Sequence, residues 1–279
     1  RDRIMALVKN TSLIKKNSKT FYLASAFLPY NVKKKVLEVY AFCRLYDDIV
    51  DLKLDNNLDN LQSKIEHLDL NEKVIEQIKI GIGSDRNFKR YNNIHELIQY
   101  SYRVAGCVGL IMCELLSVKD AKHKYHAIDL GIAMQLTNIC RDISEDLING
   151  RVYIPKNMLP EDNISIKDET VLKCINELLI LSEKYYESAL CGIKHVPIRS
   201  RFSILLALRL YQAIGKKIKR NKSAYLIKKI NTTKLEKFLI LMLCFFEFLF
   251  IHSFSLRKTQ HNSKLHEAVK GFPFTHEKI

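Results

Sequence analysis

Side-chain oxygens recur along one segment of the chain at a spacing that could bind a metal ion. Within residues 135–146 they stand three or four positions apart, at Gln135, Asn138, Asp142 and Asp146. Residues at this spacing share one face of a helix, so the segment presents two amides followed by two carboxylates. Carboxylates kept among apolar residues are costly to hold ionised without a cation. A hard divalent cation such as Mg²⁺ takes oxygen ligands and often bridges to phosphate groups, so it would stabilise them.

A second, similar arrangement lies upstream, where Arg44, Asp47 and Asp51 fall on one helical face. One carboxylate pair on a helix is most often a solvated edge. Two pairs, each with an arginine within one turn and each among apolar residues, favour a shared site instead. Facing each other, they would hold two or three Mg²⁺ ions and a diphosphate.

The elements that must position these side chains are predicted to be helices. No stretch of convincing length shows the alternating pattern of a strand. We expect helices over residues 11–28, 31–52, 59–80, 94–116, 120–147, 168–192 and 198–220. The chain has only nine glycines and five prolines and no low-complexity linker. We therefore predict one all-α domain over residues 1–279, a bundle with a cavity between its helices and a loosely ordered tail after about residue 257.

The composition bears on partners and on the cellular compartment. A net charge of +15 would suit a nucleic-acid-binding protein, but the lysines are scattered along the chain and no nucleic-acid-binding motif accompanies them. We expect no nucleic-acid partner, and a surface suited to diphosphates and anionic lipid headgroups. Seven cysteines without a C-x-x-C pattern are typical of a reducing cytoplasm.

The segment 238–251 is strongly apolar and contains Glu247. It is shorter than the roughly 20 apolar residues that a membrane-spanning helix needs. We predict a helix that is buried or touches the bilayer. The protein would then be cytoplasmic, with peripheral contact at the inner face of the membrane.

Five stretches of the chain together resemble the squalene and phytoene synthases, which join two isoprenoid diphosphates head to head. They occur in the order found in that family and span roughly residues 14–220. They are Ser18–Phe21, Cys43–Asp51, Tyr100–Gly109, Gln135–Asp146 and Arg151–Pro155. Each stretch alone is a weak signal, whereas the set is a strong one. The resemblance implies a helical bundle of the isoprenoid-synthase type.

The resemblance also implies a reaction. Two geranylgeranyl diphosphates would condense through prephytoene diphosphate to phytoene, the first committed step of carotenoid biosynthesis. The implied cofactor is Mg²⁺, as two or three ions that Mn²⁺ could replace, and no NADPH is expected. Downstream carotenoid enzymes are candidate partners.

Roles for individual residues follow from the same resemblance. The implied metal ligands are Asp47, Asp51, Asn138, Asp142 and Asp146. The implied substrate-binding residues are Ser18, Thr20, Phe21, Arg44, Gln135, Asn138, Arg151 and Tyr153. The implied catalytic residues are Asp47, Asp51, Asp142, Asp146, Tyr100 and Arg141.

Two further patterns have competing interpretations. Gly106 and Gly109 stand inside a predicted helix, where glycine costs about 1 kcal/mol relative to alanine. They could allow close packing against another helix, or, by the resemblance, leave room for a prenyl chain. His123, His126 and Asp129 superficially suggest metal ligands, but the polar, lysine-flanked start of that helix favours a solvated face.

Three alternatives to the predicted function remain. A squalene or dehydrosqualene synthase would use farnesyl diphosphate, and pocket depth would decide between the two chain lengths. A di-iron bundle needs Glu-x-x-His pairs, and no histidine here has a glutamate three residues before it. A non-enzymatic basic helical protein would explain the charge but not the two aspartate stripes. The connection from Asp51 to Gly106 is also shorter than in the family by about a helix, which would open part of the pocket.

Overall fold

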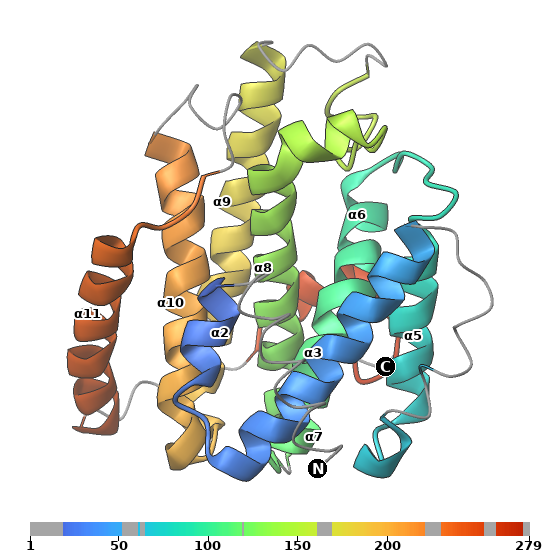
Figure 1. The fold of residues 1–279 in the computed structure, drawn as a ribbon. Coiled ribbons are helices and arrows are strands. Elements are labelled where there is room, and N and C mark those ends of the chain that lie inside the picture. The colour runs from blue at the N-terminus through green and yellow to red at the C-terminus, as the bar shows by residue number, and fades with distance from the viewer. Residues whose placement is uncertain are drawn as a thin grey trace.

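The computed structural model describes residues 19–51, 61, 65–118, 120–160, 169–220, 230–253 and 261–275. Over these residues it consists of helices and their connections (Figure 1), so the predicted all-α class is confirmed. The longer helices are α2 (Lys19–Ser25), α3 (Tyr30–Asp51), α5 (Glu72–Gly83), α6 (Ile94–Ser101), α7 (Cys107–Leu115), α8 (Ala121–Ile148), α9 (Glu169–Gly192), α10 (Ile198–Arg220) and α11 (Lys234–Ser253). The short ones are η2 (Glu66–Leu68), η3 (Tyr102–Gly106), η4 (Ile193–His195) and η6 (Ser263–Val269).

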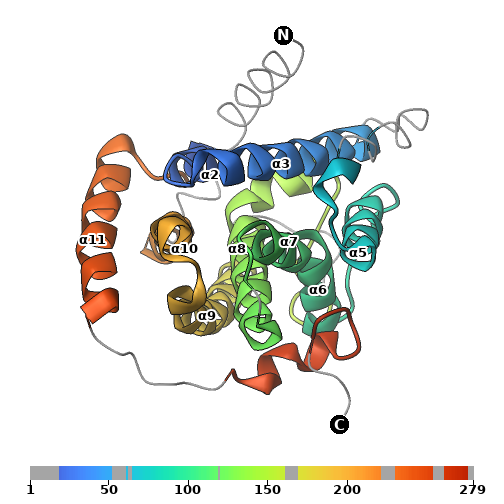
Figure 2. The ribbon, with the colours of Figure 1, turned by 90° about the horizontal axis from the view of Figure 1, so that it is seen from below.

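Helix α8 is the centre of the bundle. It packs against α6, α7, α9, α10 and η3, and Figure 2 shows it surrounded by these elements. Ile128, Ile132 and Leu136 are fully buried along it. Each buried side chain of this size stabilises the fold by roughly 1.5–3 kcal/mol. The helix expected over 120–147 is confirmed as α8, which stops at Ile148, and Gly150 follows with φ of 72°.

The crossing of α7 and α8 depends on small residues. A β-carbon at Gly109 would lie 2.1 Å from the carbonyl oxygen of Ala127. One at Gly131 would lie 2.1 Å from the carbonyl oxygen of Ala105. Such distances are far below van der Waals contact, so the two backbones touch only because both positions are glycine. Close packing is therefore the role of Gly109, and the alternative that it leaves room for a prenyl chain is wrong.

Two predicted helices differ in detail. The one expected over 94–116 is α6 and α7 joined by η3, a π-helical turn. Of the one expected over 59–80, the described residues show Leu61 in a helix, the turn η2, and α5, which begins at Glu72. The Asn71 side chain caps α5 by accepting a hydrogen bond from the Lys73 amide. Before it, Asp69 has the left-handed φ of 50°, which a continuing helix does not allow. A left-handed residue followed by an N-cap explains why α5 begins at Glu72 and is separate from η2.

The expectation of a loose tail is wrong for residues 261–275. His266, Ala268 and Val269 are buried there. Gln99 donates a hydrogen bond to the Ala268 carbonyl at 2.9 Å, and the Tyr185 hydroxyl donates to the Leu265 carbonyl at 2.8 Å. The segment therefore packs as part of the core, beside α6 (Figure 2). Buried side chains and backbone hydrogen bonds give it a fixed place that its polar sequence did not indicate.

Helix α11 lies at the edge of the molecule, against α10 (Figure 1). Its inner face buries Cys244 against Leu206 and Leu210. Arg209 of α10 also donates to Glu247 of α11, with Nε 2.9 Å from Oε2. Among the described residues, no helix has the length and apolarity needed to cross a bilayer. All seven cysteines have free thiols.

Candidate functional site

The predicted stripe of amides and carboxylates lies on the C-terminal half of α8. Gln135, Asn138, Asp142 and Asp146 are all half-buried, at the boundary of the core. Arg141 makes a bidentate contact with Asp142, with Nε 2.8 Å from Oδ1. Oδ1 of Asn138 is buried and accepts no hydrogen bond from the part of the chain that the structure describes. A buried amide oxygen without a donor is unusual, and it is available to a ligand.

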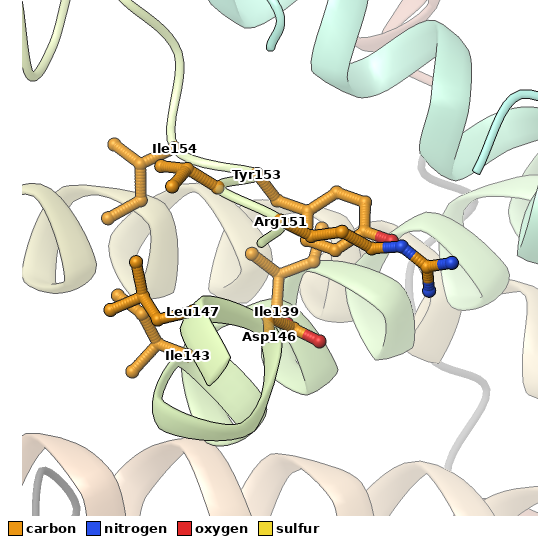
Figure 3. A pocket seen from close by; sticks show the side chains of 8 residues that line it. Ile139, Ile143, Asp146, Leu147, Arg151, Tyr153 and Ile154 are labelled. Carbon is orange, nitrogen blue, oxygen red and sulfur yellow. The ribbon is translucent and has the colours of Figure 1, made fainter. Parts of the chain in front are cut away.

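Asp146 lines a small cavity of about 10 Å³, together with Arg151, Tyr153 and five apolar residues, Ile139, Ile143, Leu147, Val152 and Ile154. Figure 3 shows the side chains of Asp146, Arg151 and Tyr153 extending towards the same side. Burial raises the pKa of Asp146 to about 7, and the negative charges of Asp142, Glu145 and Asp85 add to this effect. Arg151 opposes it. The local field at this end of α8 is therefore short of positive charge.

A buried aspartate that sequence reasoning missed organises the tyrosines beside this cavity. The Asp85 carboxylate accepts from the Tyr100 hydroxyl at 2.7 Å and from the Tyr153 hydroxyl at 3.0 Å. The two rings stack with centroids 5.3 Å apart. Arg151 donates to the backbone carbonyl of Asp85 at 3.2 Å. Asp85 lies in the turn after α5, where no periodicity or spacing could have indicated it.

The first aspartate motif lies on α3, where one arginine holds two carboxylates. Arg44 Nη1 is 3.1 Å from Asp47 Oδ2, and Nη2 is 2.7 Å from Asp48 Oδ1. Asp48 was not among the predicted site residues, although it is the next residue in the motif. Asp51 ends α3, and its side chain lies outside the described part of the structure, as does Ser18.

The predicted residues of α2 pack against α3. The rings of Phe21 and Tyr40 stack with centroids 4.9 Å apart. Thr20, next to Phe21, is half-buried. Phe21 therefore forms a continuous aromatic surface with Tyr40 of α3.

The structure thus brings Tyr100, Arg151 and Tyr153 together around Asp85, close enough for the Asp85 charge to act on Asp146. Asp142 and Arg141 follow one turn away on α8, while Arg44 and Asp47 form their own group on α3. The α8 donors are all oxygens, one of them a buried amide oxygen with no hydrogen bond and one a carboxyl whose pKa is raised. Both features fit a hard divalent cation.

Comparison with a solved protein defines the class. The fold is similar to that of a dehydrosqualene synthase solved in complex with a ligand, with a TM-score of 0.80 and 25% sequence identity. The likeness covers 91% of this chain and 99% of the solved one. An all-helical bundle of this shape with aspartate motifs on two of its helices defines a prenyltransferase that acts on prenyl diphosphates.

Sequence comparisons agree with this class. The chain belongs to the squalene/phytoene synthase family, whose model matches residues 14–77 and 58–236. It is 30% identical over 265 residues to 15-cis-phytoene synthase of Enterobacter agglomerans, covering 81% of this chain and 90% of that protein. It is 29% identical over 266 residues to phytoene synthase of Cereibacter sphaeroides, covering 81% and 75%. The protein is therefore an enzyme of head-to-head prenyl condensation.

Proposed function

We propose that this enzyme joins two molecules of geranylgeranyl diphosphate to form phytoene, by way of prephytoene diphosphate. The observation that carries the proposal is the C-terminal end of α8. There Asp146 and Arg151 line a small cavity together with Tyr153 and five apolar residues. Asp142, paired with Arg141, lies one turn before Asp146. The chain also aligns with 90% of the length of a 15-cis-phytoene synthase. The reaction needs charged groups that bind the diphosphates, and this end of α8 supplies them.

The proposed metal ligands are Asp47, Asp51, Asn138, Asp142 and Asp146. When bound, two or three Mg²⁺ ions, or Mn²⁺ in their place, would supply Lewis acidity that neutralises a departing diphosphate. The unpartnered Asn138 oxygen and the raised pKa of Asp146 support this assignment, because both indicate a place where a cation is favoured. No NADPH is required by the proposed reaction.

Diphosphate binding is assigned to Arg44, Arg141 and Arg151, with Ser18, Thr20 and Gln135 as polar neighbours. Arg44 and Arg141 are already oriented by aspartates on their own helices. A guanidinium held in this way loses little freedom when it binds phosphate oxygens. The arginines thus position the diphosphates before the carbon–oxygen bond breaks.

The aromatic residues would protect the carbocation that forms when diphosphate leaves. Burial raises the pKa of Tyr100 and of Tyr153 well above the ordinary value for a phenol, so both remain neutral. Their hydroxyls are directed at Asp85, which holds the two rings in a stack. Neutral ring faces stabilise a cation without reacting with it. They would also exclude water from the reacting carbon. Phe21, which stacks on Tyr40 of α3, is proposed as a separate apolar wall for substrate.

A second candidate substrate is farnesyl diphosphate. It is favoured by the similarity to a dehydrosqualene synthase structure, which this chain covers over 99% of its length. The product would then be a C30 hydrocarbon. The two candidates differ in the depth of the apolar pocket and not in the charged residues.

The test is to incubate the purified protein with Mg²⁺ and either diphosphate, with and without NADPH, and to identify the extracted hydrocarbons by mass. We expect phytoene from geranylgeranyl diphosphate, in equal yield with and without NADPH. A C30 main product, or a reduced product that forms only with NADPH, would contradict the proposal.

We further infer that the enzyme contacts a membrane through the outer face of α11. This face is defined by eight exposed apolar residues, Phe238, Leu239, Met242, Leu243, Phe245, Phe246, Leu249 and Phe250. Their exposed fractions run from 39% to 68%. An apolar helical face on a protein with a net charge of +15 is complementary to an anionic bilayer. The bilayer would also receive the apolar product.

Flotation with vesicles of phosphatidylcholine, with and without phosphatidylglycerol, tests this contact. We expect binding that increases with phosphatidylglycerol and that the double change Leu243→Ser and Phe246→Ser abolishes. Ile180→Ser is the matched control, because Ile180 is an exposed apolar residue on α9. Equal flotation of wild type and the α11 variant would contradict the assignment. Binding that resists both high salt and alkaline carbonate would indicate an integral anchor instead.

A further inference from the structure

A buried carboxylate lies in the N-terminal half of α8, away from the prenyl diphosphate site. Asp129 is fully buried, with 0% of its surface exposed. It precedes Asp142 by thirteen residues. At 1.5 Å per residue the two are about 20 Å apart along the helix. The proposed reaction gives Asp129 no task, and a buried carboxylate needs compensation.

Two histidines from the C-terminal segment meet this carboxylate. His261 Nε2 is 2.8 Å from Asp129 Oδ2, and His266 Nε2 is 2.9 Å from Oδ1. The side chain of His261 is 5% exposed and that of His266 is 0% exposed. Two imidazole nitrogens and a carboxylate oxygen lie within 4.8 Å of one another. They come from segments more than 130 residues apart in the sequence, and they converge on one point.

A surrounding shell orients these groups. The Ser188 hydroxyl of α9 donates to Asp129 Oδ2. His126 Nδ1 lies 3.2 Å from the Ser188 oxygen, and the His126 ring is 5.2 Å from the His261 ring. Metal sites commonly have such an outer layer of hydrogen bonds, which fixes the directions of the ligands. The interpretation of this end of the helix as a solvated face is wrong, because both His126 and Asp129 are buried.

The ligand types indicate which ion would bind. Mg²⁺ prefers oxygen ligands, whereas imidazole suits zinc and other late transition metals. Two histidines and one carboxylate are a common zinc ligand set, with a fourth position for water or another side chain. The histidine nitrogens now lie at hydrogen-bond distance from the Asp129 oxygens. They need only move slightly apart to bind an ion between them with bonds of about 2.0–2.2 Å.

We propose that Asp129, His261 and His266 form a binding site for one transition-metal ion of the Zn²⁺ class, separate from the Mg²⁺ site. The bound ion fastens residues 261–275 to α8 and so stabilises the fold. Its role is structural, because the site is enclosed by the core and by the C-terminal segment. The alternative is a triad held by hydrogen bonds alone, and the following experiment separates the two.

The experiment uses the full chain carrying no polyhistidine tag. The protein is dialysed against EDTA, reloaded with Zn²⁺, and passed through a desalting column. Zinc is then counted by mass spectrometry, and thermal unfolding is followed with and without the metal. We expect about one zinc per chain and a melting temperature several degrees higher with zinc than without it. Mg²⁺ in place of Zn²⁺ should produce no such rise.

The variants His261→Gln and Asp129→Asn should lose both the zinc and the shift. His67→Gln is the matched control, since His67 is an exposed histidine on η2 that pairs with Glu38 and not with Asp129; it should keep both. If Asp129→Asn does not fold, His261→Gln decides, with circular dichroism as the check on folding. Cobalt loading adds a second measurement, because a tetrahedral Co²⁺ site gives visible absorption bands. Less than stoichiometric zinc in wild type, or equal zinc in wild type and His261→Gln, would show a hydrogen-bonded triad only.

Discussion

The two ends of α8 present aspartates to opposite kinds of neighbours. At the C-terminal end, Asp146 faces other carboxylates, and burial together with their charge raises its pKa to about 7. Near the N-terminal end, Asp129 is more deeply buried. There burial alone would also raise the pKa, but hydrogen bonds from His261 and His266 outweigh burial and hold it below its ordinary value. Arg151 offsets only part of the effect at Asp146, whereas hydrogen bonds from two histidines stabilise the charged form of Asp129.

The role of a buried aspartate thus depends on where the groups that compensate its charge come from. Around Asp146 the compensating groups are ligands, namely cations and a diphosphate, which bind and leave with each turnover. Around Asp129 it brings its own nitrogen donors from the end of the chain. The first arrangement is suited to catalysis, and the second to holding the fold together.

The largest effect is expected from removing carboxylates at the C-terminal end. Asp142→Asn or Asp146→Asn should reduce turnover by two or more orders of magnitude, because charge stabilisation by bound metal is worth several kcal/mol. The melting temperature should change little, since both side chains are half-buried and stand at the edge of the core. Steady-state kinetics at saturating Mg²⁺ and a circular-dichroism melt measure the two effects.

Asp129→Asn provides the contrast within the same helix. It should lower the melting temperature by several degrees, while turnover measured well below the melting range falls by less than tenfold. Glu76→Gln, at an exposed position of α5, is the neutral control for both assays. Wild-type turnover in either Asp142→Asn or Asp146→Asn would contradict the difference between the two ends of α8.

The second largest effect is expected at the close contact between α8 and η3. Gly131→Ala places a β-carbon 2.1 Å from the Ala105 carbonyl oxygen, so α8 and η3 must separate. Overpacking of this kind costs about 1–3 kcal/mol, and a backbone clash belongs to the upper part of that range. Denaturant unfolding measures the loss. Gly83→Ala is the matched control, since nothing lies within 4 Å of its β-carbon position; an equal loss in both variants would refute the close-packing role.

The smallest effect is expected at Asp85, which supports the catalytic end indirectly. Asp85→Asn weakens the hydrogen bonds from Tyr100 and Tyr153, and bonds to a charged group are worth about 1.5–3 kcal/mol. We expect a stability loss of about 1–2 kcal/mol and a fall in kcat of roughly tenfold with KM nearly unchanged. Tyr153→Phe, which removes one of the two bonds, should lie between this variant and wild type. A change in KM alone would assign Asp85 to substrate binding.

Much of the catalytic end could be predicted from the sequence because its signals are local. Asn138, Asp142 and Asp146 share a face through helical spacing alone, and Asn149-Gly150 ends the helix. The arginines beside Asp47 and Asp142 are within one turn of their partners, so their contacts follow from helix geometry. The family resemblance added Tyr100 and Tyr153, which no spacing connects. Their roles in the reaction stay predictions.

The rest depends on contacts that no local pattern reports. Asp85 lies in a turn, and its two tyrosine partners are 15 and 68 residues away in the sequence. The His261 and His266 partners of Asp129 lie 132 and 137 residues away, in a segment whose polar composition suggested a loose tail. Only the packing of the C-terminal segment against α6 and α8 brings these groups together, and a single sequence does not record that packing.

The π-helical turn η3 limits where residues can be inserted into or deleted from this chain. Each residue of a helix advances its face by about 100°, so η3 sets the rotational phase between α6 and α7. Upstream of it, Tyr100 must meet Asp85; downstream, Gly109 must meet Ala127. Deleting one residue within 102–106 would rotate α7 relative to α6, so only one of these two contacts could be kept. The stretch from Tyr100 to Gly109 should therefore not tolerate insertion or deletion, and an alignment of homologous chains should carry it as a block without gaps.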